Sequence, residues 1–137
     1  MEQEVKRHLF DASSILAYFN GDVGAQVVKR VLQESQREGD GLFITAIQVG
    51  EVYLFMLRGM GREAAIGAIQ DLEKLGFTVV PTEPQEACQA SELKNRLGLH
   101  YSDAVAVATA IALKCTVVTS DPDFEKAGKV VKILWTW

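Results

Sequence analysis

Short continuous apolar runs alternate along the chain with longer segments in which apolar residues recur every three or four positions. Short runs between turn signals are typical of buried strands, and the longer periodic segments are typical of helices. Strands are predicted at residues 8–10, 42–44, 77–80, 115–119 and 130–134. The run at 115–119 is continuous and rich in β-branched residues, so it is the strongest of these predictions.

Helices fill the intervals between the strands. They are predicted at residues 15–19, 23–38, 46–58, 62–75, 83–97 and 102–113. We expect Ser13 and Ser14 to cap the first helix, Thr45 to cap the third, and Gly98 to end the fifth. The helix at 102–113 is apolar nearly all round, which predicts a central position.

This alternation predicts an α/β fold, a three-layer α/β/α sandwich around a mostly parallel sheet. A chain of 137 residues fits one core, and we expect a single domain over residues 1–137. In open parallel sheets ligands bind beyond the carboxyl ends of the strands. Chemistry is therefore expected at that rim.

Four acids stand in or beside apolar segments. Asp11, Glu51 and Asp103 are each the only charged residue of their own apolar stretch, and Asp121 directly follows the apolar run that ends at Ser120. A buried charge costs several kcal/mol unless it is paired, protonated or bound to a metal. Because these segments contain no lysine or arginine, we expect the four acids to converge on one cation site.

Each acid also has a simpler interpretation. Asp11 and Asp103 could cap the helices that they begin, although Ser102 is an equally good cap beside Asp103. Asp121 precedes a proline, which is common turn chemistry. Glu51 lies too far into its helix to cap it, so its simpler alternative is a salt bridge to a distant basic residue.

The chemistry that four converging carboxylates support is specific. Their oxygens are hard ligands suited to Mg²⁺ or Mn²⁺. Such ions polarise a phosphoryl oxygen and lower the pKa of a bound water. The pattern therefore predicts a metal-dependent hydrolase of phosphodiesters, with Asp11, Glu51, Asp103 and Asp121 as metal ligands and catalytic residues.

Composition limits the alternatives. The net charge of −4 argues against a protein that coats nucleic acid, but four clustered carboxylates equal the whole imbalance, so a nuclease remains compatible.

Cys88 and Cys115 have no zinc spacing, and we expect two buried thiols in a reducing compartment. No apolar run approaches the length of a membrane span and no leader pattern is present, so we expect a cytoplasmic protein. His8 is expected on an edge strand and His100 in a loop.

Other catalytic motifs are missing from the sequence. It contains no phosphate-binding loop of the GxxxxGK type, no GxGxxG and no GxSxG. Asp11 follows a strand as in aspartyl-phosphate phosphatases, but those enzymes expect a second aspartate two residues later, where this chain has Ser13.

With these residues in view, the chain resembles PIN-domain ribonucleases, and among them the VapC toxins of prokaryotic toxin–antitoxin pairs. The resemblance covers nearly the whole chain. It rests on four motifs, LFDASSILAYF at 9–19, FITAIQVGE at 43–51, GLHYSDAVAVATAIA at 98–112 and VVTSDPDF at 117–124. The last two are together the most specific.

The resemblance implies an acidic pocket that binds Mg²⁺ or Mn²⁺ and cleaves RNA internally by activated water. It makes Asp11 and Asp103 the surest ligands, gives Ser13 and Thr119 the role of bracing the acids, and leaves Asp123 as an accessory acid. The last residues, Leu134 to Trp137, are less typical of the family, and Trp135 and Trp137 are expected either to pack on the core or to cover a partner surface.

Three functions remain open from the sequence. The first is a toxin endoribonuclease paired with a small protein antitoxin, the second is a nuclease of RNA processing or decay without an antitoxin, and the third is a binding module without catalysis. Four mutually repelling carboxylates disfavour the third. The surplus of apolar residues in the helices at 53–60 and 66–75 further predicts a two-fold homodimer.

Overall fold

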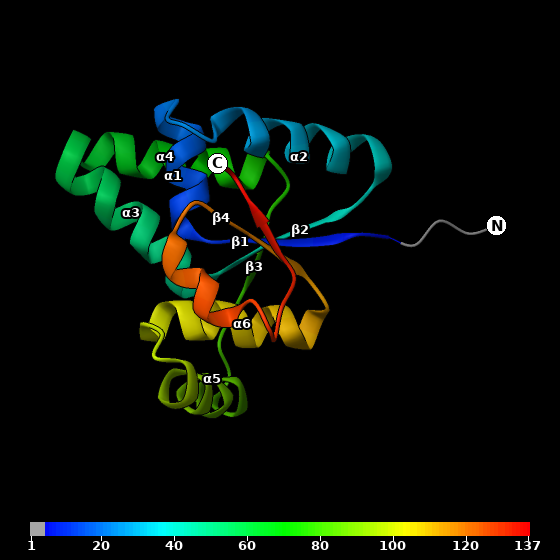
Figure 1. The fold of residues 1–137 in the computed structure, drawn as a ribbon. Coiled ribbons are helices and arrows are strands. Elements are labelled where there is room, and N and C mark those ends of the chain that lie inside the picture. Colours follow the sequence, from blue (N-terminus) through cyan, green and yellow to red (C-terminus); the bar gives the residue numbers. More distant parts are fainter. Residues whose placement is uncertain (1–4) are drawn as a thin grey trace.

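The computed structural model describes residues 5–137, and within them five parallel strands form one sheet (Figure 1). The strands are β1 (Arg7–Phe10), β2 (Gly41–Thr45), β3 (Thr78–Val80), β4 (Thr116–Thr119) and β5 (Ile133–Trp135). Their order across the sheet is β3-β2-β1-β4-β5, so β1 is central. Leu9 of β1 pairs with Phe43 of β2 on one side and with Val117 of β4 on the other.

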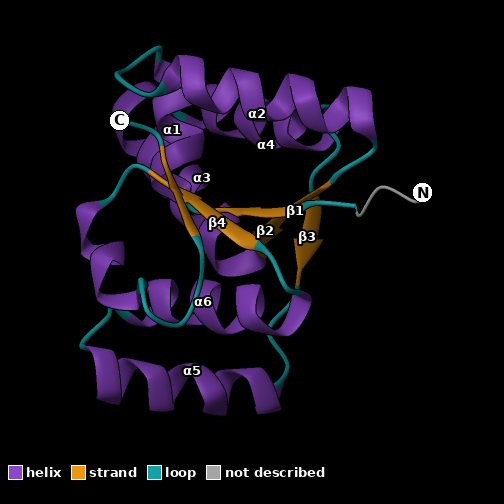
Figure 2. Ribbon diagram, turned by 45° about the vertical axis from the view of Figure 1, so that its right-hand side comes forward, coloured by secondary structure: helices purple, strands orange, loops and turns teal. Residues whose placement is uncertain are grey.

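Helices cover both faces of this sheet. They are α1 (Ala12–Asn20), α2 (Ala25–Glu38), α3 (Ala46–Met60), α4 (Arg62–Lys74), α5 (Pro84–Leu97) and α6 (Tyr101–Leu113), with a 3-10 helix η1 (Pro122–Ala127) after β4. Figure 2 shows α1 to α4 on one face, and α6 on the other face with α5 outside it. The predicted α/β/α sandwich with a parallel sheet is confirmed.

Alternation along the strands divides the core into two halves. Phe10 and Val118 point into the cluster under α1 to α4, whereas Leu9 and Val117 point into the cluster with α5 and α6. Both faces of the central strands are therefore apolar, which is why they read as continuous apolar runs. The predicted central helix is confirmed, because every residue of α6 from Asp103 to Ala110 is buried.

Several local predictions were wrong in an informative way. Asp11, not Ser13 or Ser14, caps α1, which begins earlier than predicted. The last strand begins at Ile133 rather than at residue 130, because the N–H groups of Val130 and Val131 bond to the carbonyl of Ala127. At the start of α6 neither Ser102 nor Asp103 is the cap, since His100 holds that position without a side-chain bond.

Two further predictions concern burial and strand position. His8 lies on the central strand rather than on an edge, and partial burial lowers the pKa of its imidazole. Cys115 is buried as predicted, and burial raises the pKa of its thiol to about 11. Cys88 is exposed, because it lies on the outer face of α5. Across residues 5–137, none of the helices has the length and apolar character that crossing a bilayer requires.

Candidate active site

The strand order places the carboxyl ends of β1 and β4 side by side at one edge of the sheet, and this edge with the acids around it is called the crevice from here on. From β1 the chain moves outward to β2 and β3 on one side, whereas β4 and β5 lie on the other side. This reversal is the topological switch point at which open α/β sheets bind ligands. Asp11 follows β1 directly, and Asp121 follows β4 by two residues. The fold therefore brings two of the predicted acids to one crevice.

Asp11 is the most deeply buried of the four acids, with 2% of its surface exposed. As the N-cap of α1 it accepts the Ser14 N–H at 2.9 Å on Oδ1. Thr119 Oγ1 lies 2.7 Å from Oδ2 and donates to it. Ser13 Oγ lies 2.8 Å from Oδ1 and 2.7 Å from Oδ2. Burial raises the pKa of Asp11, while the bonds from Thr119, Ser14 and Ser13 oppose that rise.

These bonds leave part of the carboxylate open. A carboxylate offers about four lone-pair positions, and each of the three donors supplies one hydrogen. Ser13 touches both oxygens but can donate to only one of them at a time. One acceptor position of Asp11 is therefore left by these donors for a further ligand. The helix cap and the ligand are compatible roles for the same side chain.

Asp103 reaches the crevice from the first turn of α6, and 7% of its surface is exposed. Its pKa is raised to about 6, first by burial and then by the negative charges of Asp11, Asp121 and Glu51. Its hydrogen-bond partner is a neutral amide, because Gln48 Nε2 lies 3.4 Å from Oδ1. The like charges of its neighbours leave the carboxylate electrostatically uncompensated, which favours binding of a cation.

Gln48 is the residue of this site that the sequence analysis missed. It is 1% exposed and lies on the first turn of α3, whose cap Thr45 accepts the Gln48 N–H as predicted. Its Oε1 accepts the N–H of Ala12 at 2.7 Å, and its Nε2 bonds both the carbonyl of Ser102 and the carboxylate of Asp103. The side chain therefore joins α1, α3 and α6 beneath the acids. Its position as an amide in an apolar stretch was the same signal that identified Glu51.

Asp121 and Glu51 lie at the outer part of the crevice. Asp121 is half-buried and caps η1 by accepting the Asp123 N–H at 2.9 Å. Glu51 is exposed on α3, so the expectation of a buried glutamate was wrong. One turn before it, Gln48 occupies the buried position of the helix instead. Both acids still act on Asp103 through their charge.

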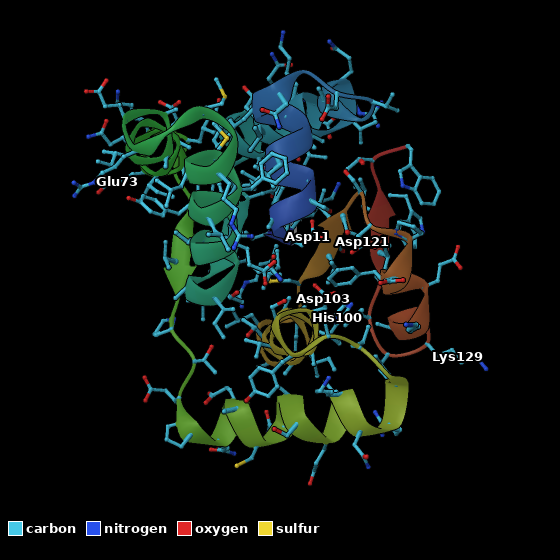
Figure 3. The ribbon with its side chains drawn as sticks, turned by 90° about the vertical axis from the view of Figure 1, so that its left-hand side faces the viewer. Asp11, Glu73, His100, Asp103, Asp121 and Lys129 are labelled. Carbon is cyan, nitrogen blue, oxygen red and sulfur yellow. The ribbon has the colours of Figure 1, made fainter. Side chains whose placement is uncertain are left out.

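Two backbone N–H groups after β4 donate to side chains that hold Asp11. The N–H of Ser120 donates to Ser13 Oγ at 3.0 Å, and the N–H of Asp121 donates to Thr119 Oγ1 at 3.0 Å. Figure 3 shows Asp11, Asp103 and Asp121 grouped at this edge with His100 beside Asp103, while Glu73 and Lys129 lie well away from them. His100 is exposed in a loop, as predicted.

The donor set suits a hydrated hard cation. Among residues 5–137, no three side chains of the His, Cys, Asp and Glu types converge tightly enough to enclose an ion by themselves. Mg²⁺ keeps several waters and takes only one or two carboxylates from the protein. Two buried aspartates, one with an open acceptor position and one uncompensated, meet that requirement.

Comparison with protein families identifies the class. Residues 9–130 match the family model of the PIN domain, and the chain belongs to the PIN domain family. The match contains Asp11, Gln48, Glu51, Asp103 and Asp121, and thus the whole crevice. A comparison with curated proteins finds no match.

Solved structures show the same fold. A Mycobacterium tuberculosis structure, VapC20, described as a sarcin–ricin loop cleaving toxin, is 21% identical with a TM-score of 0.71, over 88% of this chain and 95% of that one. VapBC2 from Rickettsia felis, bound to a promoter DNA fragment, is 13% identical with a TM-score of 0.75, over 93% and 97%. FitAcB from Neisseria gonorrhoeae is 22% identical with a TM-score of 0.67, over 95% and 98%. The chain is similar in fold to all three.

Proposed function

We propose that this protein, as one PIN domain over residues 1–137, is a metal-dependent endoribonuclease and the toxin of a toxin–antitoxin pair. The observation that carries this proposal is the pair of buried aspartates Asp11 and Asp103, whose negative charge is not offset by a bonded cation among residues 5–137. Membership of the PIN family supports nuclease chemistry. One similar structure is described as a toxin and another as a toxin–antitoxin complex, which supports the biological role.

Asp11, Asp103, Glu51 and Asp121 would hold Mg²⁺ or Mn²⁺, and a bound ion of this type supplies a water of lowered pKa and neutralises charge on the phosphoryl group. Asp11 and Asp103 are the inner ligands in this proposal, because both are buried and fixed. Asp121 and Glu51 lie further out and contribute charge or contact through water.

The remaining residues hold the two inner acids in place. Thr119 and Ser13 hydrogen-bond Asp11, which orients its carboxylate and favours its ionised form. Gln48 restrains Asp103 and ties it to the start of α1. Preorganised ligands of this kind lose little entropy when the substrate phosphate arrives.

A direct test measures cleavage of RNA by the purified chain with Mg²⁺ or Mn²⁺, with EDTA, and with the variant Asp103→Asn. We expect activity with either metal, none in EDTA and a loss of at least a hundredfold in Asp103→Asn. Asp71→Asn, which removes an exposed aspartate from α4, is the matched control and should keep full activity. Full cleavage in EDTA or by Asp103→Asn would reject the proposal.

The toxin role needs its own experiment. Induced expression in a bacterial host should arrest growth, and co-expression of the protein encoded beside this gene should restore it. Cleavage without growth arrest, together with no inhibitory neighbour, would assign the chain to RNA processing or decay instead.

A further inference from the structure

We propose that Trp137 is a stacking platform for a base of the RNA substrate beside the scissile position. This inference rests on the proposed function, because it assigns to the ribonuclease site a residue that recognises substrate. It begins from the sheet. Since β1, β4 and β5 are parallel, the residues that follow each strand emerge at the same rim. Asp11, Asp121 and Trp137 follow these three strands in turn.

The spacing of the strands sets the distance between the end of β5, near Trp137, and the end of β1, near Asp11. β5 lies beside β4, which lies beside β1. Neighbouring strands are about 4.8 Å apart, so the end of β5 lies about 10 Å from the end of β1. A base held at the end of β5 therefore belongs to a nucleotide close to the one at Asp11, and not to a remote part of the RNA.

Trp137 is fixed at this place by hydrogen bonds. Its Nε1 donates to the carbonyl of Ser120 at 2.9 Å, and Ser120 is the residue immediately before Asp121. The preceding Thr136 is buried, donates its N–H to the carbonyl of Thr119 at 3.2 Å and shares a hydroxyl bond with Ser120. A Cβ built at Gly24 would lie 2.6 Å from Thr136 Oγ1, so the segment packs directly on the backbone before α2.

The indole then presents one open face. Trp135 stacks on Trp137 with ring centroids 4.8 Å apart and an interplanar angle of 24°. Trp137 nevertheless keeps 58% of its surface exposed, because the stack covers only one side. A rigid ring with one free face is the arrangement on which unpaired RNA bases stack.

The negative charge of the chain makes an uncharged contact to RNA important at this site. The chain has a net charge of −4 and the crevice is lined by acids, so general attraction to phosphates is weak. Stacking on an uncharged ring does not depend on that attraction. It contributes about 1–3 kcal/mol per base, which corresponds to a change in Kd of about 5- to 150-fold.

The chain offers a specific reporter for this contact, because Trp135 and Trp137 are its two tryptophans. In a variant that combines Trp135→Phe with Asp103→Asn, tryptophan fluorescence comes from Trp137 alone, and we expect the RNA to stay intact. We expect single-stranded oligouridylate and oligoadenylate octamers to quench this fluorescence at saturation. Absence of quenching while the labelled octamer binds, as measured by anisotropy, would overturn the inference.

Substitution tests the energy of the contact. In the Asp103→Asn protein, Trp137→Ala should raise the Kd for the labelled octamer about tenfold or more. Trp137→Phe, which keeps a ring, should stay within about threefold. In the active protein Trp137→Ala should raise KM and leave kcat within about twofold. Ile111→Ala, which trims an exposed side chain near the far end of α6, is the control and should change neither value.

The outcomes separate this inference from the proposed function. Unchanged octamer affinity in Trp137→Ala, with metal-dependent cleavage intact, would overturn the platform alone. Equal losses in Trp137→Phe and Trp137→Ala, with a lowered Tm, would make Trp137 a structural residue and also overturn it. If RNA affinity is unchanged and only binding of the antitoxin weakens, the ring belongs to a protein interface. If RNA quenches the reporter variant but the parent chain shows no cleavage with either metal, the platform is supported and the nuclease is rejected.

Discussion

The hydroxyl of Thr119 donates to Asp11 Oδ2 across 2.7 Å, and this bond joins the carboxyl ends of the two strands that border the crevice. The oxygen of the Thr119 hydroxyl, Oγ1, also accepts the N–H of Asp121 at 3.0 Å. One buried side chain therefore positions an inner acid and the backbone of an outer one. Because the hydroxyl has a single hydrogen and gives it to Asp11, its orientation is fixed.

Thr119→Val should therefore damage the site more than its small change in shape suggests. It removes a hydrogen bond to a carboxylate, which is worth about 1.5–3 kcal/mol, and leaves the Asp121 N–H without its acceptor. The free energy of unfolding should fall by that amount in urea titrations, and a higher Mg²⁺ concentration should be needed for half-maximal cleavage. The matched control is Thr109→Val, since the Thr109 hydroxyl bonds the Val105 carbonyl within its own helix α6 and does not touch the acids. Equal effects of the two substitutions on stability and on the Mg²⁺ requirement would show that Thr119 has no particular role at the site.

The raised pKa of Asp103 predicts how stability changes with pH in the absence of metal. The folded pKa of about 6 lies above the ordinary aspartate value of 3.8, so the folded protein holds this proton more tightly than the unfolded chain. The stabilising contribution is complete below about pH 4 and is lost as the pH rises through about 6. The free energy of unfolding should therefore fall over that interval by about 1–3 kcal/mol.

Asp103→Asn should remove this part of the pH dependence and be more stable than the parent protein above pH 6 without metal. Mg²⁺ should raise the Tm of the parent at pH 7.5 but have little effect on the variant, because a ligand that binds only the folded state stabilises it. Asp71→Asn should behave as the parent in both measurements. A parent protein that gains stability from pH 4 to 7 relative to Asp103→Asn would contradict the assignment.

The sequence predicted the fold well because its strongest signals are local. Apolar runs and their spacing located the strands and α6, since both faces of the central strands and most of that helix are buried. It also predicted that Asp11 and Asp103 are buried. The errors depend on tertiary structure. The sequence predicts His8 on an edge strand, but the strand order places β1 in the centre. It predicts a buried Glu51, but the buried face of α3 is the one that carries Gln48.

Gln48 shows most clearly what a single sequence hides. Its amide is identifiable as a polar residue in an apolar helix, but its partners, Ala12 and Asp103, lie 36 and 55 residues away. As a neutral amide it is neither a base nor a preferred metal ligand, so its residue type does not point to a catalytic site. Only the packing of α1, α3 and α6 shows that it supports the site.

The exposed apolar residues of α3 and α4 predict self-association. Met60 of α3 and Ile66 of α4 are 68% and 40% exposed, and the two helices pack against each other. A two-fold contact would bury this surface against its own copy. Light scattering at micromolar concentration should give twice the mass of 15.0 kDa, and Met60→Glu should halve it. Ile111→Glu, on the opposite side of the sheet, should remain a dimer. A parent chain of monomeric mass would reject the prediction.

The acidic crevice predicts how an antitoxin would block the enzyme. A surface pocket of about 570 Å³ on α3 is lined by Glu51, Leu54, Phe55, Arg58 and Gly59. Its apolar wall suits the side chains of a partner segment, and Glu51 both lines this pocket and acts through its charge on Asp103. An arginine on that segment could bond two carboxylate oxygens at once. Affinity would come mainly from the apolar wall, while the arginine blocks the acids.

Alanine at this arginine should therefore restore most of the ribonuclease activity while the antitoxin stays bound. Two quantities are measured, the RNA cleavage at saturating antitoxin and the Kd of the complex by calorimetry. Leu54→Ala in this chain should do the opposite, because it weakens the complex and leaves the arginine intact. Arg62→Ala, at the start of α4, changes an exposed residue outside the pocket and is the control. Full inhibition by the alanine-substituted antitoxin would show that the crevice is blocked in another way, by steric closure or by a change in the acids themselves.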